Sequence, residues 1–437
     1  MGAENVVFIA FFISAVVLFS LKVRDIISGI RLGQPIDRSD HSSERWKTML
    51  RVAFGQSKMM TRPLVGVLHF FVYAGFLIIN IEVLEIVVDG VTGAHRSFAF
   101  AGGFYDFLIG AFEILAILTW IACAVFLIRR NIIKVKRFHY REMTKWPKSD
   151  ANLILITEIL LMTAFLTMNA ADHLLQGKAD HYISAGSFPV SSTIVAPLLS
   201  GINEGALVLI ERLCWWFHIV GILAFLNYLP YSKHFHIILA FPNVFFSNLN
   251  RKGKFTNLES VTSEVKLMLD PNANPYAAPP ADAAPKRFGA KDVTDLTWKQ
   301  LMDAYSCTEC GRCSSSCPAN QTGKLLSPRK IMMDTRDRIE EVVEGRKKNG
   351  KDFNDNKSLL GDYILPEELW ACTSCNACTQ ECPVNIDPLS IIVDLRRYLV
   401  MEESKAPQEL ALMFTNIENN GAPWQFPAAD RLKWKDE

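Results

Sequence analysis

Two cysteine runs toward the C-terminal end carry the residue types and the spacing of a metal-cluster protein. Each run reads C-x2-C-x2-C-x3-C-P. The first contains Cys307, Cys310, Cys313 and Cys317, and the second contains Cys372, Cys375, Cys378 and Cys382. This spacing is typical of bacterial proteins with two iron–sulfur clusters, in which the fourth cysteine of each run ligates the other cluster. We therefore predict one [4Fe-4S] cluster on Cys307, Cys310, Cys313 and Cys382, and another on Cys372, Cys375, Cys378 and Cys317.

Zinc sites and disulfides are the alternatives for these cysteines. Zinc binds four thiolates readily, but zinc gives no reason for a proline after the last cysteine of both runs. Disulfides belong to oxidising compartments, whereas the loop charges described below place the runs in the cytoplasm. The two remaining cysteines, Cys123 and Cys214, lie in apolar stretches and are expected to be core thiols.

The first 246 residues are strongly apolar and predict a membrane domain. Five stretches have about the 20 apolar residues that a helix needs to cross a bilayer, and they lie near 5–24, 64–88, 106–128, 151–171 and 206–229. The first stretch is followed, not preceded, by basic residues, which favours a retained anchor over a signal peptide. A formal net charge of +1 gives no reason to expect a nucleic-acid partner.

The loop charges predict the orientation in the membrane. Segments 22–63 and 129–150 are rich in Lys and Arg, whereas 89–105 and 172–205 carry one basic residue each. Basic loops stay on the cytoplasmic side. We therefore expect a multi-pass protein of the inner (plasma) membrane, surrounded by membrane lipid, with its N-terminus outside and the chain after about residue 230 in the cytoplasm.

The rest of the chain is expected to be a helical soluble domain on a linker. Residues 247–291 read as an interfacial segment and a Pro/Ala-rich linker, and 292–437 as the cluster domain. Ser327-Pro328 and Asp387-Pro388 are typical helix starts, with a capping side chain before a first-turn proline. The predicted fold class is all-α: five spanning helices, 1–246, followed by an α-helical ferredoxin domain.

Histidines at membrane depth are candidate haem ligands, because ionisable residues there are costly and imidazole is a common axial ligand. His69 lies in the second stretch, and His218 and His236 lie on and just beyond the fifth. The latter two are eighteen residues apart, about five turns. On one helix continuing through Pro230 they would face the same way, about 27 Å apart.

The stretch WWFHIVGILAFLNYLPYSKHFHIILAFPNVFF, residues 215–246, resembles the fifth helix of the cytochrome b subunit of respiratory nitrate reductase. The resemblance implies that His69 and His236 hold an inner haem b. The second-helix partner of His218 would fall near Ile79 and is missing. His173, at the outer end of the fourth stretch, is the candidate replacement, so one or two haem b groups are expected.

The cluster domain resembles the iron–sulfur subunit of heterodisulfide reductases. The resemblance lies in FGAKDVTDLTW (288–298), CTECGRC (307–313), CTSCNACTQECPV (372–384) and NGAPWQFP (420–427). It implies an electron carrier that works with a soluble cysteine-rich CCG-type or flavoprotein subunit. These 437 residues contain neither a CCG domain nor a Gly-rich dinucleotide fingerprint, so we expect a separate subunit that grips the tail through Trp424 and Phe426.

Carboxylates at membrane depth complete the candidate residues. Glu82, Glu85 and Glu113 fall in the outer half of their stretches, Arg212 lies near their level, and Glu158 lies toward the inner side. Such groups mark a quinone site or a proton path, or else form structural Glu–Arg pairs.

These features together predict the electron-transfer subunit of a quinone-linked oxidoreductase complex in a respiratory chain. Electrons would move between a soluble partner and the quinone pool through two [4Fe-4S] clusters and haem b. The alternatives are a quinol-linked thiol/disulfide reductase subunit and a membrane redox sensor without turnover.

Overall fold

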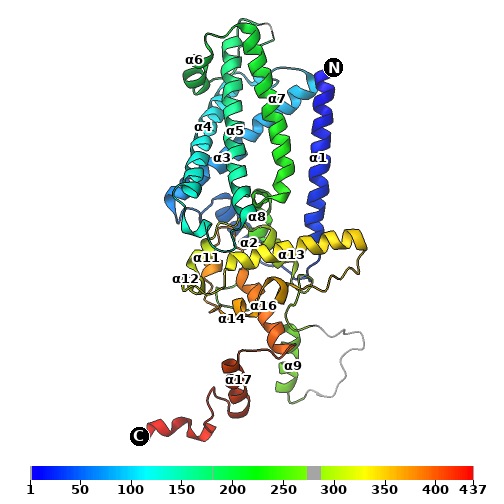
Figure 1. Ribbon diagram of the computed structural model, residues 1–437, viewed down its shortest axis with the longest axis vertical. Helices are drawn as coiled ribbons and strands as arrows, with labels where there is room; N and C mark the ends of the chain where they lie inside the picture. Colours follow the sequence, from blue (N-terminus) through cyan, green and yellow to red (C-terminus); the bar gives the residue numbers. More distant parts are fainter. Residues whose placement is uncertain (1, 180, 273–286, 437) are drawn as a thin grey trace.

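The computed structural model describes residues 2–179, 181–272 and 287–436. Within these ranges the chain is helical, and extended backbone pairs only at two isolated bridges, Gln34–Thr297 and Leu360–Ile364. Long helices fill one half of the molecule and short helices the other (Figure 1). The predicted all-helical fold is confirmed for the described residues.

Five long helices stand side by side and are long and apolar enough to cross a membrane. They are α1 (Ala3–Ile30), α3 (Pro63–Thr92), α4 (Gly103–Asn131), α5 (Lys145–Leu175) and α7 (Glu204–Tyr228). Outward-facing apolar side chains such as Leu84 and Phe107 are exposed. This surface suits lipid, where backbone polar groups must be satisfied inside each helix. The five expected spans are thus confirmed as helices, each longer than its apolar stretch.

The bundle core lies where α4, α5 and α7 meet. Ile109, Phe165 and Ile219 are fully buried there. Helix α1 joins this core at its outer end, where the ring of Phe8 lies 5.8 Å from the ring of Trp215. A side chain at Gly90 would collide with Phe8, so this glycine allows α1 to approach α3 closely.

The chain does not continue as one helix through Pro230. Helix α7 ends at Tyr228, two 3-10 turns follow (Leu229–Tyr231 and Lys233–Phe235), and a new helix, α8 (His236–Phe245), begins. Ser232 caps the second turn and donates to Asp150 Oδ1 at 2.6 Å. The spacing expected between His218 and His236 on one straight helix therefore does not apply. Helix α8 has ten residues, too few to span a bilayer.

Short helices form the soluble half and the surface on which it rests. They are α2 (Ser42–Met49), α9 (Glu259–Leu269), α10 (Trp298–Tyr305), α11 (Arg312–Ser316), α12 (Pro318–Gln321), α13 (Pro328–Asn349), α14 (Pro366–Trp370), α15 (Ala377–Glu381), α16 (Pro388–Met401) and α17 (Gln408–Asn420). The side chains of Ser327 and Asp387 cap α13 and α16, as predicted. Most of the expected Pro/Ala-rich linker lies outside the described residues.

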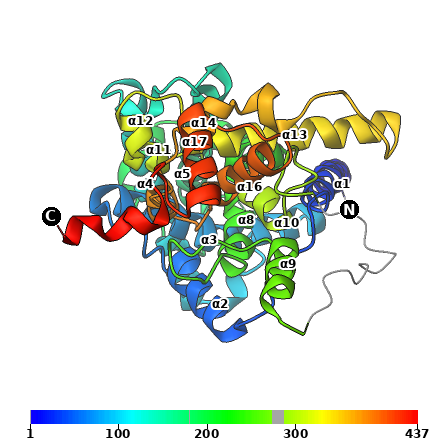
Figure 2. The ribbon, with the colours of Figure 1, turned by 90° about the horizontal axis from the view of Figure 1, so that it is seen from below.

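The soluble half rests on the basic loops at one end of the bundle. Helix α13 crosses beneath the long helices, and the view from below shows the short helices covering that end (Figures 1 and 2). Arg329 is fully buried at this contact and donates to Glu142 Oε1 at 2.7 Å and to the carbonyl of Arg137 at 2.8 Å. The cysteine runs and the basic loops therefore lie on the same side of the bundle, and the N-terminus lies at the opposite end.

Replacing Arg329 with Met should destabilise this contact strongly. The change leaves the Glu142 carboxylate, whose side chain is 5% exposed, buried without its cation, and breaking a buried pair in this way costs about 3–5 kcal/mol. Thermal unfolding in detergent should show a large fall in the midpoint. Arg397→Met, which removes a partly exposed pair within α16, is the control and should cost about 0–1 kcal/mol. Equal shifts for the two variants would contradict the assignment.

Candidate functional site

The two cysteine loops share one backbone conformation. In the first loop, Glu309 and Gly311 on either side of the second cysteine have positive φ angles of 53° and 70°. Ser374 and Asn376 occupy the same places in the second loop, with angles of 57° and 60°. Positive φ is uncommon outside glycine. Positive φ angles at matching positions therefore give the two loops the same backbone course around their cysteines.

Backbone N–H groups point at the cysteine sulfurs. Ser374 donates to the sulfur of Cys372 at 3.4 Å, and Ile386 donates to the sulfur of Cys382 at 3.3 Å. Such bonds favour the thiolate and tune a cluster's reduction potential. Burial opposes them and raises the pKa of Cys382 to about 12. Metal binding at this sulfur must therefore release a proton.

The fourth cysteine of each run lies beside the other run. The thiol of Cys382 interacts electrostatically with Cys310 and Cys307, and that of Cys317 with Cys372 and Cys375. Helices α11 and α15, which carry the third cysteine of each run, pack against each other. This is the arrangement that the crossed ligand sets require.

The alternatives of a single metal ion and a disulfide can be compared with the arrangement of the cysteines. Thiolates around one zinc ion lie about 2.3 Å from the metal. Among the residues that the structure describes, no group of three or more His, Cys, Asp or Glu side chains is compact enough for one ion. No disulfide joins these cysteines in the described chain. The eight cysteines of the two runs thus remain thiol donors for the predicted clusters.

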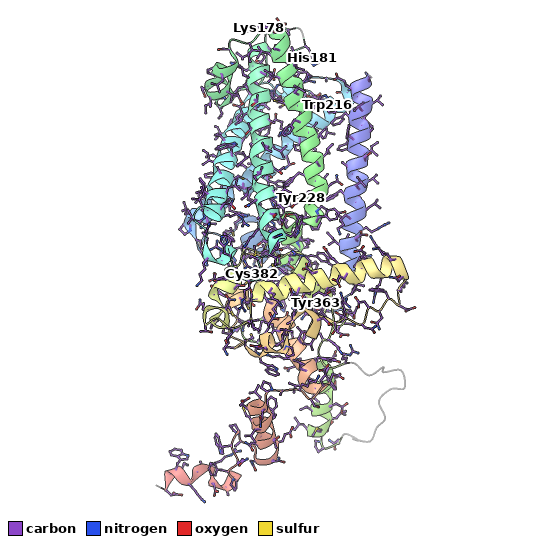
Figure 3. The ribbon with its side chains drawn as sticks, in the orientation of Figure 1. Lys178, His181, Trp216, Tyr228, Tyr363 and Cys382 are labelled. Atoms are coloured by element: carbon purple, nitrogen blue, oxygen red, sulfur yellow. The ribbon has the colours of Figure 1, made fainter. Side chains whose placement is uncertain are left out.

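A cavity of about 320 Å³ lies between the first cysteine loop and the end of the bundle that faces it, here called the inner end, with the opposite end called the outer end. His69, His234 and His236 line it from the membrane side, and Cys310 and Pro383 line it from the cluster side. Figure 3 shows Cys382 directly below the bundle, in the half that holds the cysteine loops. The cavity therefore borders both the membrane interior and the first predicted cluster.

Two histidines in this cavity are held as metal ligands would be. Nδ1 of His69 lies 2.8 Å from Oε1 of Gln56, and Nδ1 of His236 lies 3.0 Å from the carbonyl of Lys233. An imidazole whose Nδ1 is engaged in this way offers Nε2 to a metal in a fixed orientation. The structure brings His69 and His236 to the same cavity, as the sequence predicts for a haem ligand pair.

The cavity wall also contains cations suited to a carboxylated ligand. Arg129, Arg130 and Arg137 line it. Burial lowers the pKa of Arg137 to about 10, and Nε of Arg137 has no hydrogen-bond partner in the part of the chain that the structure describes. A haem propionate would balance the charge of Arg137 and accept a hydrogen bond from its Nε. Gln56 and Arg137 lie in connecting segments without periodicity, so sequence reasoning missed Gln56 and noted Arg137 only as a loop charge.

The structure does not bring His173 to His218. His218 is fully buried, with Nδ1 3.0 Å from the carbonyl of Leu161. Leu161 and His173 are twelve residues apart on α5, about 18 Å by the helical rise. His173 is exposed at the outer end and packs against Phe188. At the position expected for a ligand on α3, the structure has the buried apolar side chain of Ile79.

The predicted carboxylates fall into two groups. Glu158 lines the inner cavity, whereas Glu82, Glu85 and Glu113 are buried together in the outer half of the bundle. Arg212 bonds Glu211, its neighbour on α7, at 2.5 Å. The cation among the outer carboxylates is instead Arg96, in the loop before α4, which sequence reasoning noted only as a loop charge.

Comparison with known proteins supports the iron–sulfur assignment. Residues 302–386 match the family described as the 4Fe-4S dicluster domain. The chain is 30% identical, over 97% of its length, to the "Probable iron-sulfur-binding oxidoreductase FadF" of Bacillus subtilis. It is 27% identical, over 92% of its length, to the "EtfAB:quinone oxidoreductase" of Syntrophomonas wolfei. A CoB-CoM heterodisulfide reductase subunit of Methanosarcina acetivorans is 32% identical over 27% of the chain and matches along 60% of its own length.

The chain spans 59% and 55% of the length of the first two relatives. No solved structure matches. The comparisons confirm that the chain contains a 4Fe-4S domain of the kind that the cysteine runs predict.

Replacing Cys317 with Ser should damage the cluster held mainly by the second run, because the fourth ligands cross over. Paramagnetic resonance of the reduced protein should show one altered cluster signal. Cys382→Ser should alter the other signal, and Cys214→Ser, outside both runs, should alter neither. Loss of only the first-run cluster in Cys317→Ser would refute the crossover.

Replacing His69 or His236 with Ala should remove a low-spin bis-histidine haem spectrum, because each change deletes one axial ligand. Pyridine haemochrome analysis of the unmodified protein should give one haem per chain. His173→Ala is the matched control and should leave the spectrum unchanged. Unaltered spectra in both cavity variants would exclude this cavity as the haem site.

Proposed function

We propose that this protein is a membrane electron-transfer subunit that connects a soluble partner to the quinone pool through two [4Fe-4S] clusters and one haem b. The observation that carries the proposal is the shared inner cavity. Its walls contain His69 and His236 from the membrane domain and Cys310 from the first cysteine loop. When bound, these groups supply one-electron transfer, and the chain supplies ligands, spacing and surroundings.

The exposure of the cysteines indicates which of the two proposed clusters lies nearer the soluble partner. Cys375 in the second loop is exposed, whereas Cys307 in the first loop is buried. The second cluster would therefore meet a soluble partner, and the first would stand between it and the inner cavity. A contact of Lys58 supports this order. The side chain of Lys58, from the membrane domain, donates at 3.1 Å to the carbonyl of Cys382, which is a predicted ligand of the first cluster.

Quinone is proposed to react at the membrane side of the inner cavity. Tyr73, Phe76 and Leu77 form an apolar wall there, and Glu158 lies on the same cavity. The reaction is quinone plus two electrons plus two protons giving quinol, or its reverse. An intramembrane carboxylate beside the site is suited to exchange one of those protons.

The proposed partner is a soluble flavoprotein or CCG-type subunit in the cytoplasm. One relative is named an EtfAB:quinone oxidoreductase, which supports a flavoprotein of the EtfAB class. The tail after α17 extends away from the body (Figure 1), and Trp424 and Phe426 on it are 50% and 65% exposed. Exposed aromatics of this kind often mark a docking surface.

A quinol-linked thiol/disulfide reductase subunit is the second candidate function. It is favoured by the similarity of the cluster domain to two heterodisulfide reductase subunits of Methanosarcina acetivorans. Both candidate functions use the same proposed cofactor-binding residues of this chain, and they differ in the soluble partner.

The direct test of the proposed function is quinone-dependent reoxidation of the dithionite-reduced protein. The absorbance of the clusters should return to that of the oxidised form when a short-chain quinone is added, and faster than in His236→Ala, which should lack the haem. Reoxidation at the same rate in that variant would show that electrons reach quinone without the haem, which contradicts the proposed path. No reoxidation of the unmodified protein would favour the redox sensor.

Deleting residues 420–437 should release the soluble subunit during purification while leaving the cluster and haem spectra intact. The reason is that the tail makes its exposed aromatic side chains available to a partner and does not cover the clusters. Co-purification followed by mass spectrometry measures the loss. If the truncated protein loses its clusters, the tail is a structural lid and the docking proposal is wrong.

A further inference from the structure

A buried polar cluster occupies the outer half of the bundle, far from the iron–sulfur domain. Its centre is Arg96, which donates to Asp172 at 2.6 Å, to Asn169 at 3.0 Å and to the hydroxyl of Tyr105 at 3.0 Å. Tyr105 in turn donates to Glu85 at 2.9 Å. These groups come from α3, α4, α5 and the loop before α4, so the cluster joins most of the outer bundle.

Three buried atoms in this cluster have no hydrogen-bond partner among the described residues. They are Oε2 of Glu82, Oδ1 of Asp172 and Nδ1 of His95. Glu82 is 4% exposed and Asp172 is 1% exposed. Buried polar groups are normally satisfied by protein or by ordered water. The three orphan atoms in this cluster are therefore sites for ordered water.

The charges in the cluster favour proton exchange. Glu82 interacts electrostatically with Arg96, Glu85, Glu113 and Asp172. Glu113 is held by the N–H groups of Val190 and Ser191 at 2.9 and 3.0 Å, and Glu85 by the N–H of Phe98 at 2.8 Å. Glu82 has no such fixed donor on Oε2. Because four buried carboxyl groups around one guanidinium repel one another, Glu82 is the member best placed to accept and release a proton.

The cluster reaches the outer surface at one end. The ring of His95 lies 5.3 Å from the ring of His181, which is exposed, and Nε2 of His95 lies 3.7 Å from Asp172. Figure 3 shows His181 at the end of the bundle opposite Cys382.

At its other end the cluster approaches the inner cavity. Glu82 is five residues from Leu77, which lines that cavity, and five residues of helix correspond to about 7.5 Å. Along the axis of α3, the polar cluster and the cavity are therefore less than two turns apart.

We propose that Glu82, Asp172 and His95, bridged by ordered waters, form a proton path between the outer surface and the quinone end of the inner cavity. This inference rests on the proposed function, which supplies the quinone reaction. In quinol oxidation, two electrons leave toward the haem and the clusters, and two protons leave toward the outer surface. Reduction takes the same two protons up along the same path. Electrons and protons thus reach the quinone from opposite sides of the membrane, and the reaction responds to the membrane potential.

The test uses the complete protein with its cofactors in liposomes, with the cluster domain facing outward and pyranine trapped in the lumen. Decylubiquinol is added, and haem reduction and lumenal pH are followed together by stopped flow. The lumen should acidify in step with haem reduction. Glu82→Gln should slow both signals about 100-fold, the size expected for losing a positioned proton carrier. His95→Gln, near the mouth of the path, should slow lumenal acidification as well.

Asn80→Leu is the matched control, because Asn80 lies on the exposed face of the same helix two residues before Glu82. It should behave as the unmodified protein does. A second readout is the infrared redox-difference spectrum, in which a carboxylic acid C=O band should vanish in Glu82→Gln.

Failure of quinol to reduce the haem of the unmodified protein would refute the proposed function itself. Normal haem reduction with protons released only outside the liposomes would overturn the path and leave the function standing. An unchanged rate and an unchanged C=O band in Glu82→Gln would overturn the path as well.

Discussion

The contact between the first cysteine loop and the inner end of the bundle is the constraint on which the rest of the structure depends. Arg312, inside the loop, donates to the carbonyl of Lys58 at 2.9 Å. The side chain of Lys58 donates to the carbonyl of Cys382, in the second run, at 3.1 Å. Lys233, just before α8, bonds Glu309 between two cysteines of the loop at 2.5 Å. These bonds tie the cluster ligands to the same short segments that position His69 and His236.

The break after α7 is the second feature that places His236 near this contact. A straight helix would carry His236 beyond the cavity, whereas the turns through Pro230 and Ser232 fold α8 back under the bundle. Asp150 fixes those turns by accepting from Ser232 and from the backbone of Lys233. A polar bond at the start of α5 thus sets where a proposed haem ligand lies, and it connects the membrane fold to the cluster domain.

The features predictable from the sequence were those that depend on near neighbours in the chain. Cysteine spacing, the caps at Ser327 and Asp387 and the apolar length of the spans are all local properties. The features that were missed depend on tertiary contacts: Gln56 holding His69, Arg96 entering the bundle from a loop, and the depth difference that separates His173 from His218. Each of these features depends on how segments far apart in sequence lie relative to one another, which periodicity and spacing along the chain do not show.

The most direct test of the proposed electron path is to locate iron by anomalous scattering at the iron edge in crystals of the purified protein. Three peaks are expected. Two strong peaks should lie within the cysteine loops, one beside Cys382 and one beside Cys317. A third peak should lie between Nε2 of His69 and Nε2 of His236, in the cavity that Cys310 also lines. A third peak beside His218, or none in this cavity, would contradict the proposed path.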